Sequence, residues 1–116
     1  MSEIVRHFAP GATRARVVVH EGRVYTVATS PVKSKSMEEQ TREALKQVDA
    51  RLAEAGTDKS RLLSVSVFIT DMARKGEMNK AWDAWVDPKN PPQRACMCVQ
   101  LEGDDMIELV IVAALP

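Results

Sequence analysis

Apolar residues recur along the chain with two different periods, and these periods predict where the strands and helices lie. From residue 62 to 70 they occupy every second position, which is typical of a half-buried strand. The predicted inward face of this strand carries Leu63, Val65, Val67 and Ile69. Shorter apolar or β-branched runs predict further strands at residues 4–8, 14–20, 23–29, 94–101 and 106–115.

Two segments show the helical period instead. Ser36 and Glu39 have the spacing of a capping box, and an apolar stripe continues from Met37 until Gly56 offers a stop. A second, shorter helix is predicted over residues 72–86, with Met78, Trp82 and Trp85 on one side. We interpret these tryptophans as helix-to-sheet packing, because an aromatic stripe at helical spacing is usually core.

The predicted order of elements is strand, strand, helix, strand, helix, strand, strand, with the further short strand at residues 4–8 before them, which indicates an α+β fold in one domain spanning residues 1–116. Glu21-Gly22 and the run from Glu102 to Asp105 both read as hairpin turns. Two helices can cover one face of the sheet. The strand at 106–115 is apolar on both faces, so we expect the second face to be buried by self-association.

Charge and composition narrow the function classes. Sixteen basic and sixteen acidic residues give a net charge of +0, and no polybasic stripe favours nucleic acid or an anionic membrane. The first ten residues lack the apolar run of a signal peptide, and no stretch approaches a membrane span. Cys96 and Cys98, the only cysteines, are too close to bridge well, which predicts reduced thiols in a cytoplasmic protein.

Several segments together resemble the RidA (YjgF) family. Residues 92–96, Pro-Gln-Arg-Ala-Cys, are similar to its Pro-x-Arg-[Ser/Ala]-x strand, and residues 107–114 to its closing strand. Residues 67–72 resemble its strand-to-helix junction and residues 39–42 the start of its first helix, while residues 79–85 are closest to the YoaB-like branch. The resemblance implies a chorismate-mutase-like mixed sheet with two helices on one face, a homotrimer, and clefts between subunits.

Arg94 is the main candidate site residue. It shares a strand face with Cys96, Cys98 and Gln100, and we expect this to be a polar side of the sheet from which the guanidinium can hold a carboxylate through two parallel N–H bonds. Family members use the matching arginine in this way, whereas a lone arginine is ordinarily a solvated surface residue. Cys96 matches a family thiol position; it is either a reactive cleft thiol or a small apolar filler.

The remaining positions depart from the family pattern. The glutamate that positions water in deaminating members is Val110 here, and Glu108, two residues earlier, either approaches the cleft or is an edge carboxylate. The family's glycine-containing turn is replaced at Val27 and Ala28, which the resemblance places among the substrate-binding residues. Ala15 stands at the aromatic-hydroxyl position.

The resemblance implies hydrolysis of reactive enamines or imines, such as 2-aminoacrylate, to a 2-keto acid and ammonia. It implies no cofactor or metal, because a protonated imine is already electrophilic. The alternative is a non-catalytic binder of small carboxylate metabolites, since Val110 replaces the glutamate. A third hypothesis, an endoribonuclease or translation inhibitor, fits the neutral charge least well.

Overall fold

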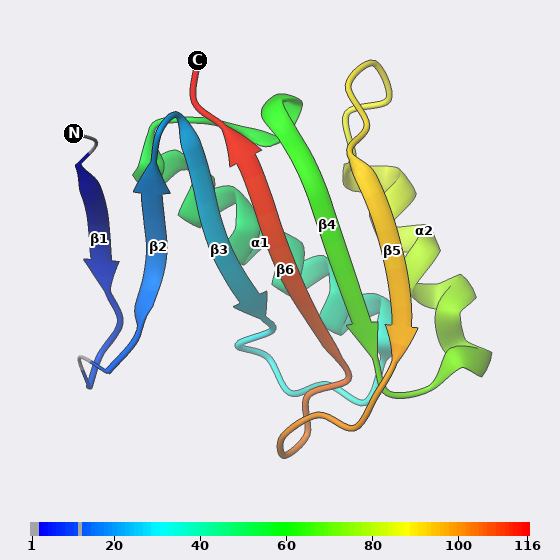
Figure 1. Ribbon diagram of the computed structural model, residues 1–116. Helices are drawn as coiled ribbons and strands as arrows, with labels where there is room; N and C mark the ends of the chain where they lie inside the picture. Colours follow the sequence, from blue (N-terminus) through cyan, green and yellow to red (C-terminus); the bar gives the residue numbers. More distant parts are fainter. Residues whose placement is uncertain (1–2, 12) are drawn as a thin grey trace.

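One mixed sheet with two helices on a single face makes up the fold (Figure 1). The structure is a computed structural model and describes residues 3–11 and 13–116. Within them, six strands are arranged in the order β1-β2-β3-β6-β4-β5. Their bounds are β1 Ile4–Phe8, β2 Ala15–His20, β3 Arg23–Thr29, β4 Leu62–Ile69, β5 Gln93–Cys98 and β6 Ile107–Ala114.

The first helix, α1, spans Met37–Ala55 and begins and ends where the sequence predicts. The Ser36 side chain accepts a hydrogen bond from the Glu39 N–H, and Gly56 ends the helix in the left-handed region at φ 89°. Its apolar stripe packs on the sheet, with Met37, Ala44, Val48 and Leu52 fully buried. Capping and stripe together therefore account for this helix.

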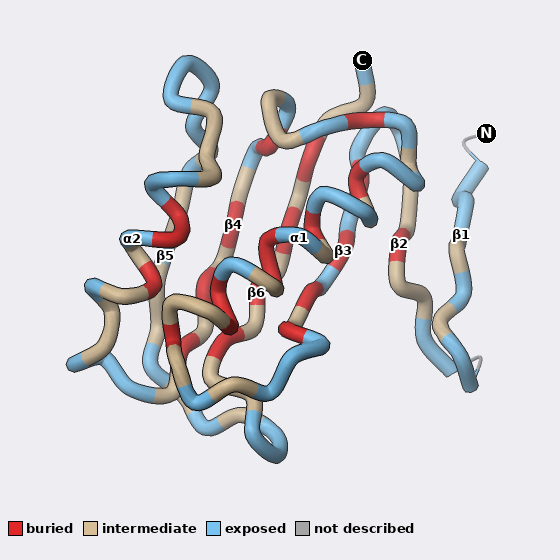
Figure 2. The backbone as a smooth tube through the Cα atoms, turned by 180° about the vertical axis from the view of Figure 1, so that it is seen from behind, coloured by how far each residue is buried: buried red, intermediate tan, exposed pale blue. Residues whose placement is uncertain are grey.

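The second helix, α2, spans Lys75–Trp85 and follows a short 3₁₀ turn, η2, at Met72–Arg74. Asp71 caps the turn by accepting a hydrogen bond from the Ala73 N–H. Met78 and Trp82 are buried, and Trp85 is partly buried against the same core, which confirms their predicted packing role. Figure 2 shows both helices on one side of the sheet.

β6 has apolar side chains on both faces, as predicted. Ile107, Leu109, Ile111 and Ala113 are buried beneath the helices, while Glu108, Val110, Val112 and Ala114 alternate with them on the open face. The strand lies between β3 and β4 and pairs antiparallel with both. A strand that is apolar on both faces therefore occupies the middle of the sheet.

The hairpin predicted between the last two strands is wrong. β5 pairs parallel with β4 at the sheet edge, and β4 separates it from β6. The connection passes the end of β4, where the Val99 N–H donates to the Ile69 carbonyl and the Thr70 N–H to the Met106 carbonyl. Residues 102–105 do form a turn. The strand that follows, β6, nevertheless pairs with β3 and β4 in the middle of the sheet, where both of its apolar faces can be buried.

The inward face of β4 also differs at one position. Leu62 is buried and Leu63 is 46% exposed, because the register between β4 and β6 shifts between Leu62 and Ser64. This bulge puts an extra residue into β4 and turns Leu63 away from the core. From Val65 onward the predicted alternation holds. None of the helices in the described part of the chain has the length and apolar character needed to cross a membrane.

Candidate functional site

Arg94 lies on β5, the edge strand beside α2. Its neighbour across the sheet is Val65 of β4, whose side chain is buried beneath the helices, so the Arg94 side chain also lies on the helix-covered face. The side of the sheet that was expected to be polar at Arg94 is therefore the side that the helices cover. The reason is the register of β5 on β4, which aligns Arg94 with the core residue Val65.

Neutral groups of α2 hold the guanidinium. Arg94 Nη2 donates to Asn79 Oδ1 at 2.9 Å, and Nη1 lies 3.6 Å from Met78 Sδ. The guanidinium carbon lies 5.3 Å from the centroid of the Trp82 ring, within the range of a cation–π contact. These contacts fix the orientation of the side chain without neutralising its charge.

Arg94 is half-buried, and no carboxylate among the described residues forms an ion pair with it. A guanidinium carries five N–H donors, and the contacts with Asn79 and Met78 occupy two of them. Charged groups that leave bulk water are normally paired. An oriented but unpaired cation at a sheet edge is therefore suited to an anion from outside the chain.

Cys96 lies on the same face of β5, opposite Val67, and is half-buried against the core. Both cysteines are free, and Cys98 is exposed. The Val99 N–H points toward β4, so by the alternation of a strand the N–H groups of Arg94 and Cys96 point to the open edge. The edge therefore combines a cation, a thiol and backbone donors.

The other predicted site residues lie elsewhere within one chain. Val27 and Val110 pair with each other across β3 and β6, and Glu108 pairs with Thr29; their side chains are on the open face. Ala28 lies on the helix-covered face and is 2% exposed. One chain thus brings Arg94 together with Cys96, and Val110 together with Val27, but the two pairs are on opposite faces of the sheet.

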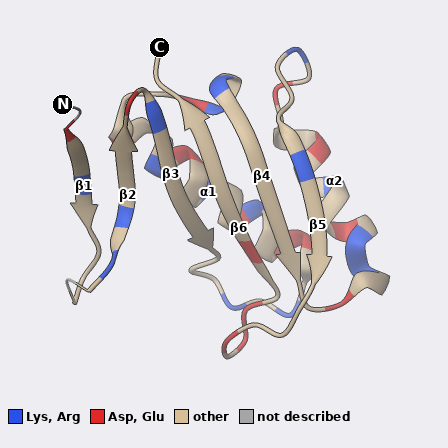
Figure 3. Cartoon of the chain, in the orientation of Figure 1, with Lys and Arg blue, Asp and Glu red and all other residues tan. Residues whose placement is uncertain are grey.

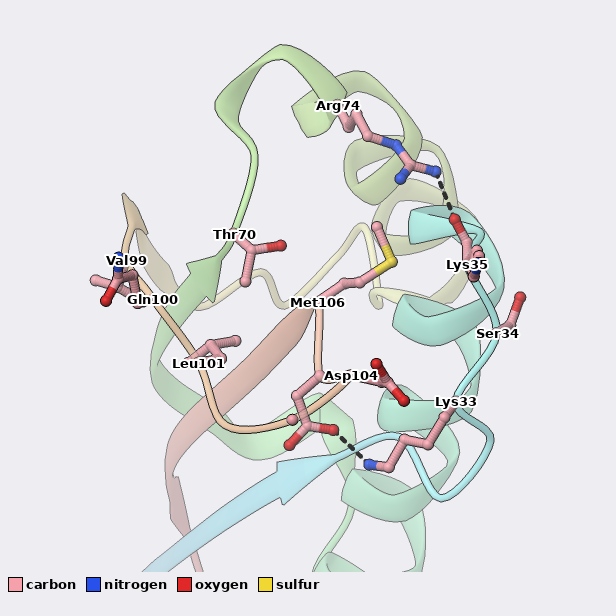
Figure 4. A pocket seen from close by; sticks show the side chains of 12 residues that line it. Lys33, Ser34, Lys35, Thr70, Arg74, Val99, Gln100, Leu101, Asp104 and Met106 are labelled. Atoms are coloured by element: carbon pink, nitrogen blue, oxygen red, sulfur yellow. Dashed lines mark hydrogen bonds and ion pairs between the residues drawn. The ribbon is translucent and has the colours of Figure 1, made fainter.

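A cavity of about 610 Å³ lies where β4 and β5 end (Figure 4). Its lining includes Lys33, Lys35 and Arg74 but not Arg94 or Cys96. Lys33 is paired with Asp105, and Arg74 with Glu77 at 2.9 Å. The Glu77 side chain raises the pKa of Arg74, and Arg74 in turn lowers the pKa of Glu77. Because Arg94 and Cys96 lie outside this cavity, it is not the predicted carboxylate site.

Gln40 is a buried polar residue that the sequence interpretation missed. Its amide nitrogen donates to the Ser34 and Asp104 carbonyls at 2.7 and 2.9 Å, and its Oε1 accepts from the Met106 N–H at 2.9 Å. The side chain is 0% exposed. It ties the loop before α1 to the β5–β6 connection. The available signal was a polar residue on the apolar stripe of the helix.

A second missed cluster holds the outer strands. His7 Nδ1 lies 2.6 Å from Glu54 Oε2, and Arg16 donates to both carboxylate oxygens of Glu54 at 2.9 and 2.8 Å. The hydrogen bond from Arg16 is the largest cause of a lowered pKa for Glu54. Arg16 also bonds to the Phe8 carbonyl. Arg16, on β2, is therefore hydrogen-bonded to both β1 and α1 and links these three elements.

These features define a small α+β protein with one helix-covered sheet and an edge strand that carries an arginine with no carboxylate partner among the described residues. The family model described as Endoribonuclease L-PSP matches residues 2–115. A RutC family protein of Haemophilus ducreyi is 39% identical over 103 residues, covering 87% of this chain and 88% of that protein. The RutC family protein YoaB of Escherichia coli is 35% identical over 99 residues, covering 84% and 87%.

The same relationship is seen in solved structures. A member of the YjgF protein family from Neisseria meningitidis superposes with a TM-score of 0.93 at 29% identity, covering 98% of this chain and 96% of that one. The chain belongs to the Endoribonuclease L-PSP family, also named YjgF or RidA. The resemblance drawn from the sequence, including its YoaB-like character, is confirmed.

Proposed function

We propose that this protein hydrolyses small reactive enamines and imines that carry a carboxylate, such as 2-aminoacrylate, to 2-keto acids and ammonia. One observation carries the proposal: the Arg94 guanidinium is half-buried, oriented by Asn79 and Trp82, and has no carboxylate partner among the described residues. A substrate carboxylate supplies the missing charge.

The chemistry needs little beyond positioning. The enamine 2-aminoacrylate takes a proton at its terminal carbon and becomes an iminium ion. Water then adds to the iminium carbon, and one of its protons passes to the amine nitrogen. The remaining hydroxyl loses its proton as the C=O bond forms and the carbon–nitrogen bond breaks, so ammonia leaves with the electron pair and pyruvate remains; the proton released replaces the one taken up by the enamine carbon. Arg94 holds the carboxylate, and the outward N–H groups of Arg94 and Cys96 orient the water or the oxygen that develops from it.

A cleft between subunits fits the position of these groups. Arg94 lies at the free edge of β5, and the open face carries apolar side chains of β3 and β6, of which Tyr25 and Val27 are 41% and 48% exposed. Burying that face against further copies would remove this apolar surface from water. A trimer would then bring the edge of one chain near the open face of another, where Val110, Val27 and Glu108 lie.

The second candidate is a non-catalytic binder of 2-keto acids, and Val110 favours it. The position faces the open side of the sheet and bears no group that can take a proton. Ribonuclease activity is a weaker candidate: Figure 3 shows Lys and Arg interspersed with Asp and Glu across the described residues, without a continuous basic stripe. RNA affinity rests heavily on such cations.

A coupled assay separates these functions. 2-Aminoacrylate is generated in place by a dehydratase, and pyruvate release is followed with and without the protein. We expect faster release with the wild type and loss of that acceleration in Arg94→Lys. Val110→Glu is assayed beside Val112→Glu, which adds a carboxylate to the same face two residues away.

If Val110→Glu accelerates pyruvate release and the wild type does not, the protein is a binder that lacks only the glutamate needed for hydrolysis at position 110. If neither the wild type nor Val110→Glu accelerates release, the hydrolase proposal is refuted. Residue 110 is assigned a catalytic role only if Val112→Glu fails to reproduce the effect of Val110→Glu.

A further inference from the structure

The helix layer carries a second hollow that the Arg94 site does not use. It is a groove of about 320 Å³ lined by residues of α1 and α2 and by Lys59 of η1 (Lys59–Arg61), and its volume is at the lower end for small-molecule sites. Its floor is apolar, formed by Leu45, Ala81, Ala84 and Trp85. Leu45 and Ala81 are buried, and Ala84 is exposed. The groove can therefore cover a small apolar body.

Cations surround this floor. Arg42, Lys46, Lys59 and Lys80 all line the groove, and the carboxylate among the lining residues is Glu38. Arg42 and Lys80 share Glu38, each at 3.5 Å, while Lys46 lies 3.2 Å from Glu43 at the margin. Exposed pairs of this kind contribute little energy and leave their cations available. Among the residues that line the groove, four cations face the one carboxylate of Glu38, so the lining carries a net positive charge; Asp49 and Asp87, which interact with Trp85 and Lys59, lie outside the lining.

Trp85 is held in place as part of the floor. Its Nε1 donates to both oxygens of Asp49 at 3.1 and 3.0 Å, which commits that carboxylate to the indole. Lys59 Nζ donates to the Trp85 carbonyl at 2.6 Å and lies 5.1 Å from the ring centroid. A fixed indole beside a fixed ammonium offers both a flat apolar contact and a charge.

The groove also lies on the opposite side of the molecule from the open sheet face, because both helices cover the other side (Figure 2). An assembly that buries the open face leaves it accessible. We propose that the groove between α1 and α2 is a binding site for small aromatic carboxylates, separate from Arg94. The ring lies on the floor at Trp85 and Ala84, and the carboxylate lies among Arg42, Lys59 and Lys80.

The probe is 4-phenylbutyrate, compared with 4-phenylbutanol, which lacks the charge, and butyrate, which lacks the ring. Calorimetry gives the affinity. Tryptophan fluorescence reports binding near either Trp85 or Trp82, and because Trp82 also contacts Arg94, the variants described next decide where the compound binds. We expect 4-phenylbutyrate to bind with a Kd on the order of 1 mM or below, more tightly than either comparison compound. Added salt should weaken binding, because the cations are exposed.

Variants localise the binding. Ala84→Phe fills the groove from an exposed position, so we expect at least about tenfold weaker binding; Ala53→Phe, at an exposed position of α1 outside the lining, is its matched control. Arg42→Gln with Lys80→Gln should weaken binding about threefold to tenfold, with Lys89→Gln as control. Circular dichroism confirms that each variant is folded.

Three outcomes refute the proposal. The first is that 4-phenylbutyrate binds no better than butyrate. The second is that Ala84→Phe, while folded, binds like the wild type. The third is that Arg94→Lys weakens 4-phenylbutyrate binding as much as the groove variants do, because the carboxylate would then be held at β5. Unchanged binding in Arg94→Lys supports a separate site, whatever the result of the hydrolase assay.

Discussion

Replacing Arg94 by lysine keeps the positive charge but removes the planar fork that a carboxylate engages through two parallel N–H bonds. Three of the five guanidinium donors remain after the contacts with Asn79 and Met78. Two of them suffice for a bidentate pair. Hydrogen bonds to a charged group contribute on the order of 1.5–3 kcal/mol, so keto-acid binding should weaken roughly 10- to 150-fold.

Titration calorimetry with pyruvate or 2-ketobutyrate measures this loss. Arg61→Lys is the matched control. Arg61 is exposed, and its Nη2 donates to the Leu115 carbonyl and to no group of β5, so the same change there should leave keto-acid binding unaltered. Arg94→Lys should remain folded, with a loss of about 1 kcal/mol from the contacts with Asn79 and Trp82. If Arg94→Lys binds the keto acid as tightly as the wild type does, the carboxylate-clamp hypothesis fails.

Asn79 provides a graded test of the same reasoning. Asn79→Ala removes the acceptor that orients Nη2 but leaves the guanidinium itself. Binding should weaken about twofold to tenfold, less than in Arg94→Lys, because orientation is lost and the charge is kept. An effect larger than that of Arg94→Lys would mean that Asn79 itself contacts the ligand.

Four further results are expected. Light scattering at micromolar concentration should give a trimer, and a stable monomer would contradict the proposed cleft. A bound keto acid should slow alkylation of Cys96 relative to that of the exposed Cys98, measured by peptide mass spectrometry. If Cys96 is alkylated equally fast with and without the keto acid, it lies outside the cleft. Arg16 lowers the pKa of Glu54 below the ordinary 4.5, so the ionised carboxylate stabilises the folded state above that value, and this stabilisation is lost as pH falls through the folded-state pKa. The urea midpoints of the wild type and Glu54→Gln should therefore differ at neutral pH and converge in acid. Glu102→Gln is the control, and its midpoint should follow that of the wild type at every pH. Gln40→Met should cost about 3 kcal/mol by urea unfolding, because buried backbone groups lose their partners, and an unchanged midpoint would show that water replaces the amide.

Local signals carried the prediction of elements. The cap at Ser36, the stop at Gly56 and the stripe of α1 all act within one or two turns, and the structure confirms them. The helix-covered sheet follows from the same periodicity. The prediction that Leu63 faces the core is wrong because a bulge inserts one residue into β4, and an alternating pattern does not show where an insertion occurs.

Pairing between distant segments was less predictable. Residues 102–105 carry genuine turn chemistry, yet the strands on either side do not pair, since β4 lies between them. The partners of Arg94 on α2 and the contact between His7 and Glu54 join residues 15 and 47 positions apart. The motif around Arg94 identified the residue, but only its register with Val65 of β4 places it beneath α2.

The central position of β6 has a consequence for the order in which the chain can fold. β1, β2 and β3 form one group of paired strands, and β4 with β5 forms another; β6 is the strand that pairs with both groups. During synthesis, the two groups and both helices are made before the strand that joins them. Until residues 107–114 emerge from the ribosome, the inner edges of β3 and β4 have no partner and the cores beneath α1 and α2 are incomplete. A nascent chain arrested before β6 should therefore be open to proteases and to pairing with other chains, although five-sixths of its strands have been translated.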